Sequence, residues 1–194
     1  KTKDVDKLNR ELIKKQEDVS FLRELILSEQ KYHRTYFQVS LARQKGIEEK
    51  LAFIENDFDK LQDWWHVDQL SQFVDKELVF DIAYKKAKEY IQNEMLFARR
   101  WGYVMFMPTL VKEKDAPEKL FPLFKDDEEY YVQMAEAWLI SYLGIYAPEK
   151  TLAYLESCPL NYKIAGKAIQ KICDSFRVTN EWKERFKEAR RKYK

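Results

Sequence analysis

Apolar residues recur along the chain at the three- and four-residue spacing of amphipathic helices, and no segment alternates strictly as a half-buried strand does. The expected helices cover approximately residues 3–15, 19–26, 30–45, 47–58, 68–74, 76–92, 95–110, 126–146, 148–159, 162–173 and 180–193. Such a succession of short helices with short joints predicts an all-α fold, an α-solenoid of antiparallel helical pairs. The alternative is a compact irregular bundle, because no strict repeat period is visible.

Composition supports helices, since four glycines and five prolines are few for a turn-rich all-β chain. The length of 194 residues suits one domain, which we expect to span residues 1–194. The chain starts at Lys1 rather than at Met, so we expect the native N-terminus to be longer. No apolar run approaches the roughly 20 residues of a membrane span.

The cysteines and histidines give no sign of a metal site. Cys158 and Cys173 form no CxxC motif and no ligand spacing with His33 or His66. We therefore predict a reduced, cytoplasmic protein with small buried thiols, no metal and no cofactor. Neither histidine is expected to act as a general base.

Charge is unevenly distributed, although the net charge is only +2. Residues 161–194 contain eleven Lys or Arg and four acids, which gives +7 and leaves −5 for residues 1–160. A basic C-terminal end can attract a polyanion. A solvated, Lys-rich terminal helix is the equally simple alternative.

The segment Asp63-Trp-Trp-His-Val-Asp68 is the strongest candidate for chemistry. Adjacent indoles are costly to leave in water, and Asp68 follows Trp65 by three residues, close to the same helical face. Arg100 and Trp138 are further candidates. The alternative is that the indoles are core, that Asp68 is a cap or a surface charge, and that Arg100 forms a salt bridge. GxSxG, HExxH and phosphate-loop motifs are absent.

This segment and three later ones resemble the bacterial DNA alkylation repair proteins of HEAT-like repeat type (AlkD-like). The later segments are Arg99-Arg100-Trp-Gly-Tyr, Tyr130-Tyr-Val-Gln-Met-Ala-Glu-Ala-Trp138, and Lys167-Ala-Ile-Gln-Lys171 through Ser175-Phe-Arg177. The resemblance extends from about residue 1 to about residue 187. It implies a curved stack of helical pairs whose concave, basic face holds duplex DNA, and glycosylase members that release purines made cationic by alkylation at N3 or N7.

By position, the resemblance implies that Asp68 is the catalytic carboxylate and that Trp65 and Trp138 flank the deoxyribose of the lesion. Trp64 is the substitute for Trp65, and Arg100, or Arg99 if the alignment shifts by one residue, would bind a backbone phosphate. The remaining phosphate contacts would come from Lys163, Lys167, Lys171 and Arg177. The expected partner is double-stranded DNA with alkylated bases, bound by a monomer.

Two departures from the family leave the activity open. Members usually have a helical pair ahead of the segment that opens here at Lys1, so either the native chain starts earlier or this is a paralogue that lost the pair; residues 29–45 also lack the expected arrangement of the DNA-facing helix. The alternative function is therefore a catalytically weak or inactive paralogue that acts as a DNA-binding or interaction module. A protein-interaction scaffold of the same fold is a third hypothesis, although a scaffold has no need of Asp68 among indoles.

Overall fold

A computed structural model describes residues 2–157 and 160–193, and every regular element in these ranges is a helix. The all-α prediction is therefore confirmed. Cys158, expected as a buried thiol, and Pro159, expected to end a helix, lie outside the described residues. The chain divides into two compact units, Lys1–Val79 and Phe80–Lys194. No helix in the described ranges is long and apolar enough to cross a membrane.

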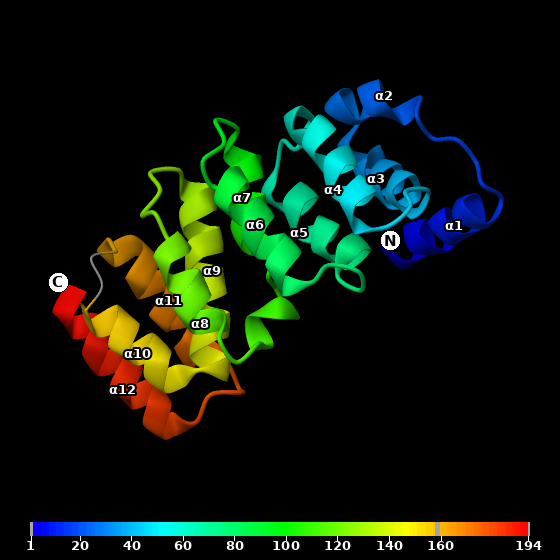
Figure 1. The fold of residues 1–194 in the computed structure, drawn as a ribbon. Helices are drawn as coiled ribbons and strands as arrows, with labels where there is room; N and C mark the ends of the chain where they lie inside the picture. The colour runs from blue at the N-terminus through cyan, green and yellow to red at the C-terminus, as the bar shows by residue number, and fades with distance from the viewer. Residues whose placement is uncertain (1, 158–159, 194) are drawn as a thin grey trace. The chain divides into compact units, whose positions relative to one another are not determined.

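The first unit is built around α3, which packs against α1 on one side and α5 on the other, while α2 packs against α3 (Figure 1). Its helices are α1 (Thr2–Lys14), α2 (Leu22–Ser28), α3 (His33–Ala42), α4 (Ile47–Asn56) and α5 (Trp64–Val74). Polar contacts add to this packing: the Arg34 guanidinium on α3 forms an ion pair with Asp6 on α1, with 2.7 Å between Nε and Oδ1.

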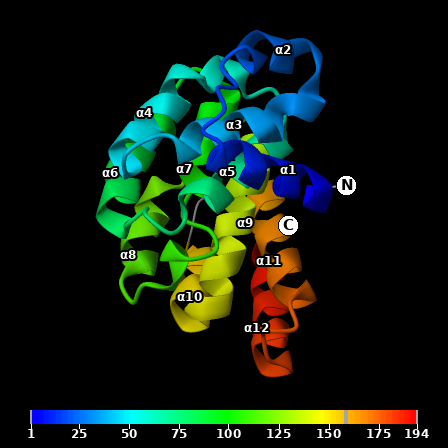
Figure 2. The same cartoon turned by 90° about the vertical axis from the view of Figure 1, so that its right-hand side faces the viewer.

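The second unit contains a row of three helices, α7, α9 and α11, and each packs against the next (Figure 2). A second layer lies on this row, with α6 on α7, α10 on α9 and α12 on α11. Its helices are α6 (Phe80–Tyr90), α7 (Leu96–Val104), α8 (Ala116–Leu120), α9 (Tyr130–Tyr146), α10 (Pro148–Ser157), α11 (Tyr162–Asp174) and α12 (Asn180–Arg190). Layered helical pairs are the architecture of an α-solenoid, as predicted. Its curvature and a concave basic face stay predictions.

Several helices of the second unit begin where the sequence indicates. Pro148 is the first residue of α10, where its missing N–H costs no hydrogen bond. The Asn161 side chain caps α11 by accepting from the N–H groups of Lys163 and Ile164. Thr179 caps α12, since its Oγ1 accepts from the Trp182 N–H at 3.5 Å.

Other boundaries were predicted wrongly. The helix expected from residue 76 starts at Phe80, because Leu78 is buried within a non-helical connection and not on a helix face. The helix expected over residues 95–110 ends at Val104. The proline-containing connection after it holds α8, which was not predicted; Pro117 falls in the first turn of α8, a position that tolerates proline.

The late start of α9 has a clear cause in Glu136, which is fully buried. One carboxylate oxygen accepts from the backbone N–H groups of Lys125 and Asp126, at 2.8 and 3.2 Å, and the other accepts from Asp127 at 3.3 Å. These donors turn inward toward Glu136, so the helix expected from residue 126 begins only at Tyr130. Burial raises the pKa of the Glu136 carboxyl, and the three donors work against that rise.

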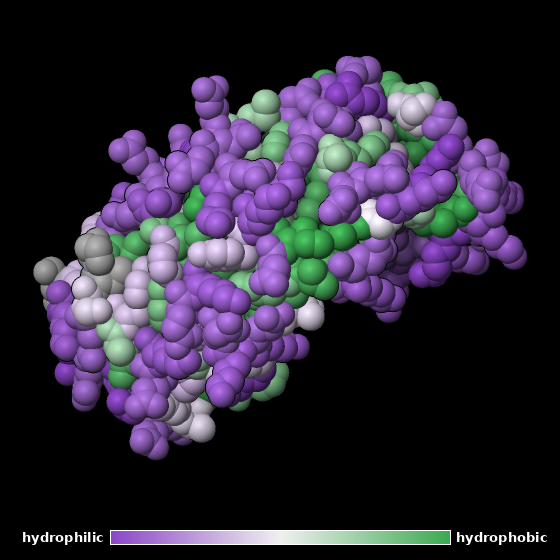
Figure 3. Space-filling view, in the orientation of Figure 1, coloured by the Kyte–Doolittle hydropathy of each residue, from purple (hydrophilic) through white to green (hydrophobic). Residues whose placement is uncertain are grey.

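The core of the second unit depends on a close approach of α9 and α11 at Gly144. A Cβ atom built there would lie 2.5 Å from Cδ1 of Ile172, which is closer than two carbons can come. Fully buried apolar side chains surround this point, among them Leu139, Ile140 and Leu143. The outer faces of α8, α10 and α12 are mainly hydrophilic in Figure 3, as expected for helices with one apolar stripe turned inward.

We expect Glu136→Ala to lower the free energy of unfolding by roughly 2–4 kcal/mol, because three backbone N–H groups lose their buried acceptor. Chemical denaturation followed by circular dichroism would measure it. Glu136→Gln is the matched control: it keeps one acceptor oxygen, so its loss should be smaller. Equal stability of the Ala variant and the wild type would show that this carboxylate does not hold the turn.

Candidate functional site

The first unit places Asp68 on α5, one turn after an exposed indole. Asp63 caps this helix, since its Oδ1 accepts from the Trp64 N–H at 2.7 Å. The Asp68 side chain is half-buried, and Trp64, four residues earlier and so on the same face of the helix, is 47% exposed. A carboxylate and an open indole face are therefore presented together.

Trp65 has different surroundings. Its indole is half-buried and meets the ring of His66 edge-on at 4.2 Å and the ring of His33 at 5.6 Å. The ring is thus part of the packing between α3 and α5. Of the two adjacent indoles, Trp64 is the one that a ligand near Asp68 can reach without displacing another ring.

Behind Trp65, His33 and His66 stack face to face, with ring centroids 3.6 Å apart and planes 12° from parallel. Both are fully buried. Burial, reinforced by repulsion from His66, lowers the pKa of His33 to about 2, and burial lowers the pKa of His66 to about 4. Two neutral imidazoles packed in this way support the expectation that neither is a general base.

In the second unit, the two predicted phosphate-binding arginines both contact the segment at the start of α9. Arg100 is buried, and its Nη1 donates to the Tyr131 carbonyl at 2.6 Å. The Arg99 guanidinium is 2.8 Å from the Asp127 carboxylate. The visible role of each is to anchor α7 to the beginning of α9, and a phosphate contact by either stays a prediction.

Trp138 lines an open groove of about 370 Å³ between α9, α11 and the turn that follows α11. We call this cavity the indole groove. Two of the predicted DNA-binding residues, Lys171 and Arg177, line it as well, so the structure brings three predicted residues together. The other lining residues are Ser141, Tyr142, Ile145, Asp174, Ser175 and Phe176.

The two remaining predicted lysines lie further along α11. Lys163 is exposed in the first turn, and Lys167 is half-buried with its Nζ 3.3 Å from Oε1 of Gln170. Neither lines the indole groove. Their four-residue spacing from each other and from Lys171 places the three side chains on one face of the helix.

The sequence reasoning missed the tyrosines of α9. Tyr142 and Tyr146 follow Trp138 at intervals of four, and their rings form a row with the indole, at centroid distances of 6.2 and 6.4 Å. The spacing was visible in the sequence. The cations that lie over these rings come from distant segments, so only the fold reveals them.

Within residues 2–157 and 160–193, no cluster of three or more His, Cys, Asp or Glu side chains could hold a metal ion. Cys173, expected to be buried, is half-buried, and burial raises the pKa of its thiol. An uncharged thiol of this kind is a poor metal ligand or nucleophile.

Comparison with known proteins gives one match. A family model described as DNA alkylation repair enzyme matches residues 1–172, which is most of the chain. No curated protein and no solved structure matches it.

The histidine pair predicts a pH dependence of stability. Above about pH 4 the folded protein keeps both rings neutral, whereas the unfolded chain takes up protons below its ordinary pKa of 6.5. Stability should therefore fall as the pH drops from 7 to 5, with a slope approaching about 1.4 kcal/mol per pH unit for each histidine. Urea unfolding at several pH values would measure it. In His33→Phe/His66→Phe the slope should flatten; an unchanged slope would assign it to other groups.

Proposed function

The chain belongs to the DNA alkylation repair enzyme family, and from this premise we propose that it is a DNA glycosylase. Its substrates would be purines in duplex DNA made cationic by alkylation at N3 or N7. The observation that supports the proposal most directly is a half-buried carboxylate, Asp68, one helical turn from the exposed indole of Trp64.

The chemistry of such a lesion requires few protein groups. Cleavage breaks the bond between C1′ of the sugar and N9 of the purine, and the bonding electrons return to the cationic base, which leaves neutral. No general acid is needed, in contrast to ordinary glycoside hydrolysis. Positive charge develops on the sugar, where the Asp68 carboxylate stabilises it. Water then adds at C1′, and Asp68 orients it and accepts its proton.

The indole beside the sugar supplies a second attraction. The face of an aromatic ring attracts a cation, and the attraction grows as the sugar becomes oxocarbenium-like. We assign this role to Trp64 in preference to Trp65, because Trp65 is occupied by its contacts with His33 and His66. The family resemblance implies that Trp138 flanks the deoxyribose of the lesion as well, and its place in the indole groove leaves it accessible to DNA.

Binding to DNA is carried in this proposal by the second unit. Lys171 and Arg177 beside Trp138 supply positive charge without reading base sequence, and Lys163 and Lys167 extend that charge along α11. Arg100 and Arg99 are weaker candidates for phosphate contacts, since the first is buried and the second is paired with Asp127.

A second candidate function is a DNA-binding module without catalysis. It is favoured by one observation: within the second unit alone, Lys171 and Arg177 lie around Trp138 in one groove, an arrangement that can hold DNA without a catalytic group. Such a module would bind alkylated DNA and release no base.

Release of free base from a duplex containing N7-methylguanine tests the first proposal. We expect the wild type to excise the base and Asp68→Asn to be slower by about 100-fold or more, because the amide carries no charge for the sugar cation. Binding and melting temperature of this near-isosteric variant should stay close to wild type. Excision at the wild-type rate by Asp68→Asn would refute the catalytic assignment, and no excision by either folded protein would favour the binding module.

Removing Trp64 and removing Trp65 should have different effects, the first on catalysis and the second on stability. Trp64→Ala should lower kcat/KM by about tenfold, corresponding to about 1.4 kcal/mol of lost transition-state stabilisation, with little change in stability. Trp65→Ala should instead lower the free energy of unfolding by about 3 kcal/mol, because it removes a ring from the packing of α3 on α5. Single-turnover kinetics and urea unfolding of both variants would check this. The reverse pattern would return the role to Trp65.

A further inference from the structure

One face of α9 carries a continuous aromatic row, formed by Trp138, Tyr142 and Tyr146. Residues four apart lie above one another on a helix, and the two centroid distances of 6.2 and 6.4 Å confirm that the rings follow each other along the axis. This spacing is comparable to one nucleotide step of an extended strand. The row occupies the last three turns of α9.

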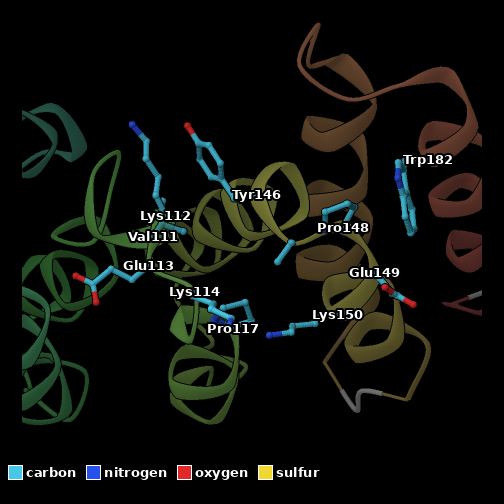
Figure 4. Close-up of a pocket in the computed structure, with 11 residues that line it drawn as sticks. Val111, Lys112, Glu113, Lys114, Pro117, Tyr146, Pro148, Glu149, Lys150 and Trp182 are labelled. Atoms are coloured by element: carbon cyan, nitrogen blue, oxygen red, sulfur yellow. The ribbon is translucent and has the colours of Figure 1, made fainter.

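Each ring of the row has a cation over it. Lys171 Nζ lies 5.8 Å from the Trp138 ring, and the Arg177 guanidinium lies 5.3 Å from Tyr142 and 5.8 Å from Tyr146. Lys112 Nζ lies 5.7 Å from the Tyr146 ring, and Figure 4 shows the two side chains next to each other. Three separate segments thus deliver positive charge to one helix face.

Two of these cations, Arg177 and Lys112, are not paired with acids among the described residues. Arg177 donates from Nη1 to the Tyr146 hydroxyl at 3.1 Å, a neutral acceptor. Within residues 2–157 and 160–193, neither Arg177 nor Lys112 forms an ion pair with a carboxylate. The acid that lines the indole groove is Asp174, against the two cations Lys171 and Arg177. The indole groove is therefore positive and aromatic, and the adjoining surface around Tyr146 carries three lysines, Lys112 among them, against Glu113 and Glu149.

The row is also open to solvent. The indole groove exposes Trp138 and Tyr142, and Tyr146 is 40% exposed. At the rim of the groove Phe176 is 93% exposed, beside Arg177 in the sequence. The Phe176 ring is therefore accessible to a ligand that occupies the groove.

We infer that this face of α9 is a track for one sugar–phosphate strand of DNA, running from Trp138 to Tyr146. The rings pack against the deoxyriboses of the strand, Arg177 and Lys112 contact its phosphates, and Phe176 packs against the strand from the rim. Aromatic platforms edged by cations are how proteins hold a nucleic-acid strand without reading its sequence. The inference rests on DNA as the partner in the proposed function but does not require base excision.

Binding of a fluorescein-labelled, undamaged DNA duplex, measured by anisotropy over a range of salt concentrations, tests the track. Tyr142→Ala/Tyr146→Ala should weaken binding by about 10-fold, because two rings that pack against the sugars are removed. Tyr142→Phe/Tyr146→Phe is the matched control, which keeps both rings and should bind within about threefold of wild type. Arg177→Gln and Lys112→Gln should each reduce the slope of log affinity against log salt by about 0.7 to 0.9.

The outcomes separate this inference from the proposed function. Wild-type affinity of the Ala double variant, with an unchanged melting temperature, would overturn the track even if Asp68-dependent excision is found. Weakened binding by that variant in a protein that excises no base would support the track and refute the glycosylase. Binding of polyglutamate, in place of DNA, with the same dependence on these residues would overturn it in favour of an acidic protein partner.

Discussion

The second unit depends on the distance at which α9 and α11 pack, and Gly144 sets that distance. Without a side chain at this position, Ile172 lies directly against the backbone of α9. Lys171 is the neighbour of Ile172, so the same approach that completes the core brings the Lys171 ammonium over the Trp138 ring. A wider separation would cost packing and would also open the groove that these two residues line. The distance between α9 and α11 therefore determines both the packing of the core and the shape of the indole groove.

The same helix is held from its other end by polar groups. Glu136 binds the turn before α9 through three backbone donors, while Arg99 and Arg100 fasten α7 to Asp127 and to the Tyr131 carbonyl. Buried and half-buried charges that are hydrogen-bonded in this way fix position better than apolar contacts do, because their geometry is directional. The first turn of α9 is thus rigidly placed, and the aromatic row follows from it.

Helical periodicity predicted most of the fold, because helices such as α11 and α12 bury one regular stripe and carry end signals such as Asn161 and Thr179. The prediction failed where a buried residue lies outside any helix and where a helix is too short to show a period. Leu78 is buried in a connection, and α8 is too short for a periodic pattern. Such cases are decided by tertiary contacts that no local pattern contains.

The candidate site was less predictable than the fold. The order of motifs pointed to Asp68, Trp138, Lys171 and Arg177, and the structure places the last three around one groove. Spacing alone could not distinguish Trp64 from Trp65, since the difference lies in the buried histidines that Trp65 contacts. Nor could it reveal that Arg100 is buried, or that Lys112 lies over Tyr146 from more than thirty residues away. Contacts between distant segments are a property of packing.

The rings and the cations of the α9 face come from different segments, and this affects how the surface can change. One helix supplies all three rings of the row, whereas its cations come from α11, from the turn after it and from the segment before α8. Charge and stacking are therefore encoded in different parts of the chain. Substitution of these cations would change how strongly the binding of a polyanion depends on salt concentration, and it would leave the sequence of the helix that carries the rings unchanged.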